Sequence, residues 1–202
     1  VAVSATFISL FASVLAAYAI ERLRFKGSRW VGLGIYFAYL VPPSILFIPL
    51  ATMVFKLQLF DTRWALILTY PTFLIPFCTW LLMGFFKSIP RDLEEQALVD
   101  GYSRIMAFLR VVMPLSLSGV IAVVVFTFAL TLHEFIYALT FVSASDQRTI
   151  SVGVPTELIR GDVFFWQSLL AAAVIVAIPV AIVYSFFLDR LVAGFTGGAV
   201  KG

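Results

Sequence analysis

Five apolar runs, each long enough to cross a lipid bilayer, constrain this chain more than any other feature. They cover residues 1–20, 30–55, 64–86, 114–142 and 164–188. A helix needs roughly 20 apolar residues to span the hydrocarbon core, where every backbone polar group must be paired within the protein. The composition agrees, because 62% of the 202 residues are hydrophobic and only 12% are charged. The sequence therefore predicts an all-α membrane protein, a polytopic helical bundle with about five spans.

Basic residues between the apolar runs predict how the chain sits in the membrane. Ten of the 14 Lys and Arg residues fall in the first, third and last polar segments, and four fall in the second and fourth. Loops on the cytoplasmic side carry the excess of Lys and Arg. This bias predicts that the third polar segment and the C-terminus face the cytoplasm, and that Val1 lies on the outer side.

Two of the apolar runs contain proline clusters, Pro42-Pro43 with Pro49 in the second run and Pro71 with Pro76 in the third. Proline removes a backbone hydrogen bond and kinks a helix. Kinked helices around a pathway would suit a protein that opens and closes. Proline is also more frequent in membrane helices generally, so the sequence leaves both interpretations open.

The longest polar window, residues 88–113, lies between the third and fourth apolar runs and is rich in charged side chains. Pro90 suits the first turn of a helix, and the carboxylates that follow are favoured near a helix N-terminus. Asp100-Gly101 predicts a helix end, because glycine readily adopts a left-handed conformation. A second helical run extends from Ser103 to Met113. We therefore expect two short helices around a sharp turn, lying in water against another molecule.

The residues of this window resemble the EAA loop in permease subunits of ATP-binding-cassette (ABC) importers. Glu95-Gln96-Ala97 stand at the E-A-A positions, Gly101 follows with the spacing of the family, and Pro114 opens the next span. Gln96 stands where the family usually has alanine. The preceding Ile89-Pro90 and Leu93-Glu94 resemble the carbohydrate-uptake branch, of the maltose/trehalose type.

This resemblance implies the fold of a type I ABC importer permease, with residues 1–202 as a single transmembrane domain. Such a subunit begins in the cytoplasm, so one further span is expected ahead of Val1, giving six in the intact protein. Residues 88–113 would form the cytoplasmic coupling loop that docks on a partner ATPase. The residues that the resemblance assigns to this docking are Glu94, Glu95, Gln96, Ala97, Asp100 and Gly101.

The C-terminal tail, residues 189–202, has four glycines among its last nine residues. Glycine disfavours helix formation, so an irregular segment is expected there. The tail resembles the ending of maltose-type permeases, which inserts between the two ATPase subunits. The resemblance therefore assigns Gly197, Gly198 and Lys201 to the ATPase interface.

His133 and Glu134 are the most unusual pair within an apolar run. An ionisable residue at membrane depth usually faces a cavity or a partner, so Glu134 is the main candidate for the translocation path. Tyr137, three positions further on, could stack on a sugar or bond to it. The pair could also reach outward to water at the membrane boundary. A third interpretation makes His133 and Glu134 a proton-linked pair in an ATP-independent secondary transporter or channel.

No catalytic motif is found in the sequence. It contains no G-x-x-x-x-G-K-[ST] phosphate loop, and Tyr137 stands where the H-E-x-x-H zinc motif would need its second histidine. The single cysteine, Cys78, permits neither an internal disulfide nor a thiolate metal cluster. The expected protein is a non-catalytic subunit without a metal or cofactor of its own, ATP and Mg²⁺ being bound by the partner ATPases.

The resemblance also implies the partners and the location. These are a second, related permease subunit forming a heterodimer, two cytoplasmic ATPase subunits, an extracytoplasmic solute-binding protein and membrane lipid. The polar loop 143–162, expected to be exposed, would face the solute-binding protein. The substrate would be a carbohydrate, a disaccharide or oligosaccharide, and no nucleic acid is involved. The expected location is the cytoplasmic (inner) membrane of a bacterium or archaeon, with several spans and a cytoplasmic C-terminus.

Overall fold

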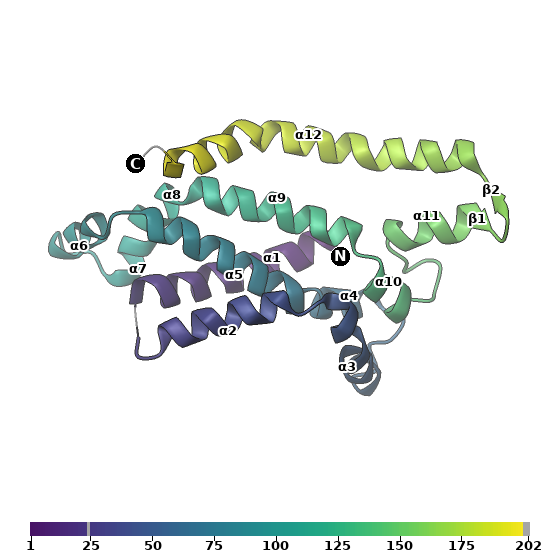
Figure 1. Cartoon of the computed structure of the whole chain (residues 1–202), viewed down its shortest axis with the longest axis horizontal. Coiled ribbons are helices and arrows are strands. Elements are labelled where there is room, and N and C mark those ends of the chain that lie inside the picture. The colour runs from purple at the N-terminus through teal and green to yellow at the C-terminus, as the bar shows by residue number, and fades with distance from the viewer. Residues whose placement is uncertain (24, 200–202) are drawn as a thin grey trace.

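Helices make up most of the computed structural model, which describes residues 1–23 and 25–199. The central bundle consists of α1 (Ala2–Tyr18), α2 (Ser28–Leu40), α5 (Pro71–Ser88) and α9 (Leu117–His133) (Figure 1). α5 contacts the other three helices of the bundle. α1 continues into a π-helical turn, η1 (Ala19–Leu23), so that the first span covers Ala2–Leu23.

The last helix, α12 (Trp166–Ala199), lies along α9 at the side of the bundle (Figure 1). None of its apolar window within Trp166–Phe187 is buried among the described residues, so lipid or another chain must cover it. The helix continues through residues 189–199, and the expected irregular tail is therefore wrong for this part. A glycine in a helix costs about 1 kcal/mol relative to alanine. Extending a helix that already exists adds one hydrogen bond per residue, which offsets this cost. Lys201 lies outside the described residues.

The predicted number of about five spans agrees with the structure when each of two bent helix pairs counts as one span. Within the described residues, three helices are long and apolar enough to cross a membrane, and two bent pairs raise the total to five. The second predicted span is one of these pairs, because α2 and α3 (Pro43–Lys56) meet at 95°. The tandem prolines Pro42-Pro43 exclude continuous helix there. In contrast, Pro49 and Pro76 lie inside α3 and α5 without ending them.

The fourth span is shorter than the predicted 114–142. α9 ends at His133, and α10 (Ile136–Phe141) begins after a break at Glu134 and Phe135. On its other side, α9 follows a short helical segment made of α7 (Arg104–Ala107), η2 (Phe108–Val112) and α8 (Met113–Leu115). This segment is bent by 73° from α9.

The predicted polar loop 143–162 contains regular structure that was not expected. It includes α11 (Ile150–Leu158) and β1 (Ile159–Arg160), which forms an antiparallel hairpin with β2 (Val163–Phe164), just beyond the loop. Val152 of α11 is fully buried, so this helix is part of the packed protein.

The remaining elements lie at the two ends of the bundle (Figure 1). One end carries α6 (Arg91–Val99), α7, α8, the α1–α2 connection and the C-terminal end of α12 (Figure 1). The opposite end carries α3, α10 and the hairpin (Figure 1). The segments with most basic residues therefore share one end, and the side of the membrane that this end faces stays a prediction.

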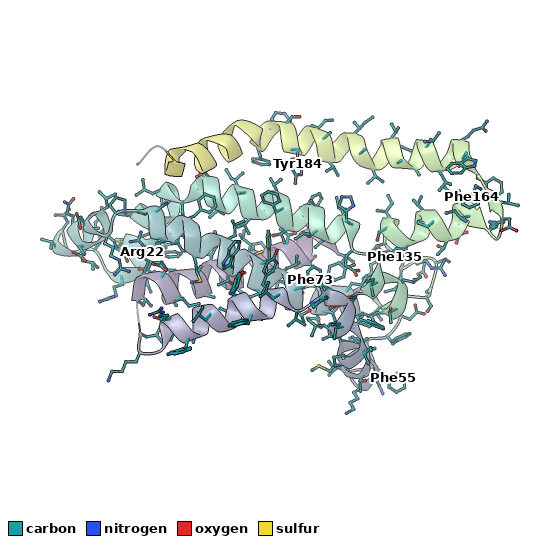
Figure 2. The ribbon with its side chains drawn as sticks, in the orientation of Figure 1. Arg22, Phe55, Phe73, Phe135, Phe164 and Tyr184 are labelled. Carbon is teal, nitrogen blue, oxygen red and sulfur yellow. The ribbon has the colours of Figure 1, made fainter. Side chains whose placement is uncertain are left out.

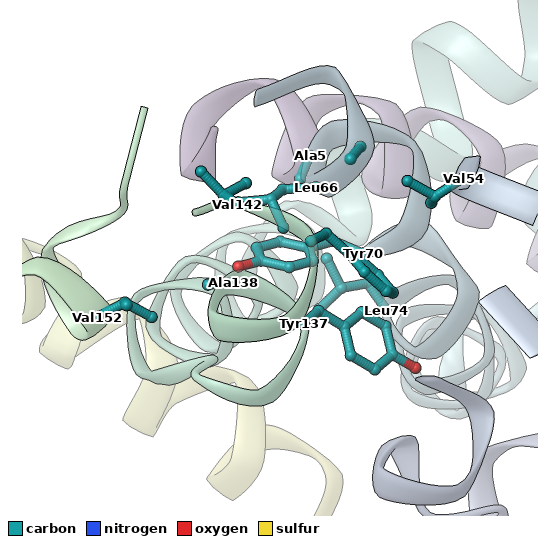
Figure 3. Close-up of a cluster of buried hydrophobic side chains, with 11 residues drawn as sticks. Ala5, Val54, Leu66, Tyr70, Leu74, Tyr137, Ala138, Val142 and Val152 are labelled. Atoms are coloured by element: carbon teal, nitrogen blue, oxygen red, sulfur yellow. The ribbon is translucent and has the colours of Figure 1, made fainter. Parts of the chain in front are cut away.

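The two largest of three apolar clusters hold the central bundle together. One lies near the α10 end and includes Leu66, Tyr70, Leu74 and Tyr137 (Figure 3). The other lies nearer α6 and contains these residues: Val14, Ala17, Tyr18, Cys78, Leu82, Phe86, Ile89, Phe108, Val112 and Val123. Near the α8 end (Figure 1), α9 approaches α5 so closely that a Cβ added at Gly119 would lie 2.3 Å from Cγ of Phe85.

Candidate functional site

The predicted helix of the polar window forms α6, and its end has the geometry that the sequence indicates. Gly101 has a φ of +89°, its N–H donates to the Leu98 carbonyl at 3.1 Å, and the Tyr102 N–H donates to the Ala97 carbonyl at 3.0 Å. This is the Schellman arrangement, which pairs the last carbonyls of a helix. The turn therefore sets the direction of the chain after α6.

A second short helix starts directly after this turn, also as predicted. The Ser103 hydroxyl accepts a hydrogen bond from the Met106 N–H at 3.3 Å and so caps α7. The guanidinium of Arg110 lies 5.6 Å from the centre of the Tyr102 ring, within the range of a cation–π contact. These contacts fix α6 relative to η2.

One face of α6 is exposed. Its residues surround an open depression of about 270 Å³ and are Asp92, Glu95, Gln96, Val99 and Asp100, which we call the coupling face. Within the described part of the chain, none of its polar side chains forms a hydrogen bond or an ion pair. Val99 is 87% exposed at the edge of this face. Exposed carboxylates around an apolar residue suit contact with another protein.

The structure divides the six predicted docking residues into groups. Glu95, Gln96 and Asp100 lie on the coupling face, and Gly101 forms the turn beside it. Ala97 is only 6% exposed and points into the protein, where α6 packs on η2. Glu94 also turns inward, so the structure corrects its placement among the exposed residues.

The Glu94 carboxylate joins α6 to the first span. The Tyr18 hydroxyl donates a 2.5 Å hydrogen bond to Oε1 of Glu94, and Nε of Arg22 lies 3.8 Å from Oε2. Arg22 is nearly buried, with 3% of its side chain exposed (Figure 2). Its Nη2 donates to the Ile89 carbonyl at 2.8 Å, and Nη2 of Arg91 donates to the Glu21 carbonyl at 2.8 Å. These bonds fasten α6 to η1.

Sequence reasoning missed Tyr18 and Arg22. Tyr18 stands within an apolar run, and Arg22 counted only as one of several loop charges. Their long-range pairing with residues about 70 positions away leaves no local pattern. The sequence did contain one signal for this contact, because Arg22 directly follows an apolar run and a charge at membrane depth needs a partner.

The three predicted path residues at the other end of the bundle do not converge on one site. Both carboxylate oxygens of Glu134 are used, because Oε1 accepts the Tyr137 N–H at 2.8 Å and Oε2 accepts the Ala138 N–H at 3.0 Å. The Tyr70 hydroxyl also donates to Oε2 at 2.9 Å. Glu134 therefore caps α10 and ties it to α5.

Tyr137 and His133 point to separate surroundings. Tyr137 is fully buried against Tyr70 (Figure 3), with ring centres 6.4 Å apart, so the prediction that it meets a sugar is wrong for this structure. His133 lines an apolar groove of about 740 Å³ between α9, α11 and α12, together with Phe135 (Figure 2). Among the described residues no hydrogen bond or ion pair joins His133 to Glu134.

A different cavity opens near the bend between α2 and α3. It measures about 470 Å³, and aromatic rings from three helices line it, namely Tyr39, Phe73, Phe77 and Phe126. The Tyr39 and Phe77 ring centres are 5.7 Å apart, and those of Phe77 and Phe126 are 6.4 Å apart. Aromatic residues in apolar runs give no sequence signal of such a cavity. No group of three or more metal-ligating side chains occurs in the described ranges.

Comparison with known proteins agrees with this architecture. Residues 9–197 match the family described as binding-protein-dependent transport system inner membrane component. The sulfoquinovosyl glycerol transport system permease protein SmoH of Agrobacterium fabrum is 39% identical over 203 aligned residues, which cover 100% of this chain and 70% of SmoH. The trehalose/maltose transport system permease protein MalG of Thermococcus litoralis is 34% identical, over 94% of this chain and 68% of MalG.

A solved structure supports the fold. The crystal structure of a bacterial ABC transporter involved in the import of the acidic polysaccharide alginate contains a chain that superposes with a TM-score of 0.77. The match covers 93% of this chain and 70% of that chain, at 22% identity. The relatives offer no support for an ATP-independent transporter or channel. The chain belongs to the binding-protein-dependent transport system inner membrane components, and it is the multi-pass, non-catalytic permease subunit of an ABC importer.

Proposed function

We propose that this permease carries a carbohydrate, a disaccharide or short oligosaccharide, which a solute-binding protein delivers. Relatives named for the transport of trehalose and maltose and of sulfoquinovosyl glycerol support a substrate of this class. The alginate importer that shares the fold also handles a carbohydrate. The exposed elements opposite α6, namely α3, α10 and the hairpin, are the proposed contact for the binding protein (Figure 1).

One observation carries the coupling mechanism. The exposed coupling face of α6 lies on the same short helix as Glu94, whose carboxylate bonds to Tyr18 and Arg22 of the first span. The coupling face would dock on an ATPase subunit, which binds ATP and Mg²⁺, while this chain needs no cofactor. Movement of the ATPase would push α6 as a rigid unit, because the turn at Gly101 and the bonds of Glu94 hold it at both ends. The push would reach the first span through Tyr18 and Arg22. Closure of the ATPases on ATP would thereby favour one of two conformations of the bundle.

The aromatic cavity near the α2–α3 bend is the proposed part of the translocation path. Aromatic faces can stack on the apolar faces of sugar rings. Because the cavity has few polar groups to hydrogen-bond a sugar, the sugar would bind weakly there and could move on. Phe77 lies between Tyr39 and Phe126 and is the central ring. Replacing it in a Phe77→Ala variant should raise the sugar concentration needed for half-maximal uptake without loss of assembly.

The remaining partners follow from exposed surfaces. A second permease subunit, forming a heterodimer, would cover part of the apolar surface that the described chain leaves open, including α12. The end that carries α6 and the C-terminus would face the cytoplasm. Gly197 and Gly198 lie in the last turns of α12 at this end and are proposed to contact the ATPases, together with Lys201.

The test is to purify the intact subunit with its candidate ATPases and measure ATP hydrolysis with a panel of binding proteins and sugars. Stimulation by a binding protein loaded with trehalose, maltose or a related sugar is the expected result. Stimulation only by solutes that are not carbohydrates would contradict the proposed substrate. Uptake driven by a proton gradient, without any ATPase, would contradict coupling altogether.

A further inference from the structure

A groove between η1, α2 and α5 combines a charged end with an aromatic wall. Its volume is about 750 Å³, and it lies at the end of the bundle that carries α6. The charged side chains that line it are Glu21, Arg29 and Lys87. In the described part of the chain, neither Arg29 nor Lys87 forms a hydrogen bond or an ion pair, and no ion pair uses the Glu21 carboxylate. The groove therefore offers two free cationic groups and one carboxylate.

The apolar part of the groove continues from these charges toward the membrane interior. Tyr36 lies seven residues beyond Arg29 on α2, and Trp80 lies seven residues before Lys87 on α5. Seven residues of helix correspond to about 10 Å, which matches the step from a lipid headgroup to its acyl chain. The Tyr36 and Trp80 ring centres are 5.9 Å apart, and both side chains are partly exposed.

Lys87 stands in the last turn of α5, at the boundary where the span Arg63–Ser88 ends. A lysine there can extend its ammonium group to the polar interface while its stem covers apolar surface. The first turn of α2 has no acidic side chain that would neutralise Arg29. Both cations thus lie where a membrane presents its phosphate groups.

We propose that this groove is a binding site for an anionic phospholipid of the phosphatidylglycerol type. Arg29 and Lys87 bind the phosphate, and Glu21 accepts hydrogen bonds from the hydroxyl groups of the headgroup. One acyl chain lies against Leu33, Tyr36 and Trp80. The net positive charge of the three groups favours a lipid with a net negative charge over a zwitterionic one. The site concerns lipid selection and does not depend on which solute is transported.

The experiment uses the assembled importer in nanodiscs that contain a lipid with a photoreactive diazirine in its acyl chain. Three labelled lipids are compared in turn: phosphatidylglycerol, phosphatidylethanolamine and phosphatidylcholine. Peptide mapping then measures the label on residues 28–36 and 80–87. We expect phosphatidylglycerol to label both segments more strongly than the zwitterionic lipids, by up to about fivefold for each basic residue.

Variants test whether the two cations cause this preference. The double variant Arg29→Gln/Lys87→Gln should label equally with all three lipids. The charge-preserving variant Arg29→Lys/Lys87→Arg should keep the preference and shows that the site tolerates substitution. The matched control Arg148→Gln/Arg160→Gln removes two basic residues near α11, at the other end of the bundle, and should leave the preference unchanged.

Three outcomes would overturn the proposal. Equal labelling of the unaltered protein by the three lipids would show that the groove does not select charge. The absence of label from every lipid would show that another protein chain covers this face. A preference for phosphatidylglycerol that the double variant Arg29→Gln/Lys87→Gln keeps in full would show that these two cations do not select the lipid.

Discussion

The Tyr18 hydroxyl donates a 2.5 Å hydrogen bond to the Glu94 carboxylate, so the first span and α6 are directly joined across 76 positions of sequence. Arg22 approaches the other oxygen of the same carboxylate at 3.8 Å. One acidic side chain thus receives contacts from two residues of one span. The coupling face lies on the opposite side of α6, exposed to a partner.

A Tyr18→Phe substitution should weaken coupling while preserving the ring that packs on Phe108, 4.4 Å between centres. Removing a hydrogen bond to a charged group costs about 1.5–3 kcal/mol. We expect reduced sugar uptake per ATP hydrolysed, measured in proteoliposomes. Tyr184→Phe on α12 is the matched control and should transport normally. Equal transport by both variants would show that the hydroxyl has no part in coupling.

Glu94 and Glu95 are neighbours with different surroundings, so their amide variants should differ in kind. Glu94→Gln leaves the nearly buried Arg22 without its counter-charge and should lower the midpoint of thermal unfolding. Glu95→Gln should leave that midpoint unchanged and weaken co-purification with the ATPase, because this carboxylate lies on the coupling face. The reverse pattern, with Glu95→Gln unstable and Glu94→Gln stable, would contradict the two-sided description of α6.

Gly101 tests the turn through its backbone angle. Among the described residues, no atom lies within 4 Å of a Cβ added there. A side chain at this position would therefore be disfavoured only by the backbone angle φ of +89°. Left-handed backbone costs an L-residue about 1–2 kcal/mol, and asparagine tolerates it better than most. Gly101→Ala should therefore reduce uptake more than Gly101→Asn, with normal insertion into the membrane. Gly161→Ala, at a φ of +61° between β1 and β2, is a control for a side chain added to left-handed backbone away from α6.

Gly119 tests the contact between α5 and α9. Even Gly119→Ala places a methyl group 2.3 Å from Cγ of Phe85, so the helices must separate or the ring must move. Overpacking of this kind costs about 1–3 kcal/mol. Gly84→Ala on α5, where no atom lies within 4 Å of the added Cβ, is the matched control. A thermal unfolding midpoint that falls equally in both variants would rule out the close contact.

Glu134 tests whether the carboxylate caps a helix or binds substrate. Glu134→Ala removes the acceptor for the N–H groups of Tyr137 and Ala138, and losing a cap costs about 0.5–2 kcal/mol. We expect lower stability and an unchanged sugar concentration for half-maximal uptake. An increase in that concentration, with stability unaltered, would return Glu134 to the translocation path.

The spans and the helix α6 could be predicted because their signals are local. Apolar length decides which segments enter a bilayer, and Asp100-Gly101 marks a helix end whatever surrounds it. The 95° bend at Pro42-Pro43 was expected only as a kink, since proline disrupts a helix without specifying the angle. The angle depends on how α3 packs on α10, which the sequence does not report.

The contacts that define the site could not be predicted because they join distant segments. Glu94 and Glu95 have the same chemistry, and only the rotation of α6 against α1 decides which of them turns inward. Tyr137 and His133 diverge because α9 stops at His133, whereas the apolar run continues to residue 142. The polar residues were found, but their roles depend on where each helix ends.

Two helical segments that contact α6 each contain a π-helical turn, η1 at the end of the first span and η2 after α7. A π-turn accommodates a residue more than an α-helix would over the same turn. Deleting one residue from either turn would rotate the adjoining span by about 100° relative to α6, while leaving its apolarity almost unchanged. Such a protein would still enter the membrane, with Tyr18 or Phe108 facing the wrong neighbours. Insertion into the membrane depends on how apolar these segments are. Passing a movement of α6 on to the spans depends on which side chains of each segment are rotated toward α6.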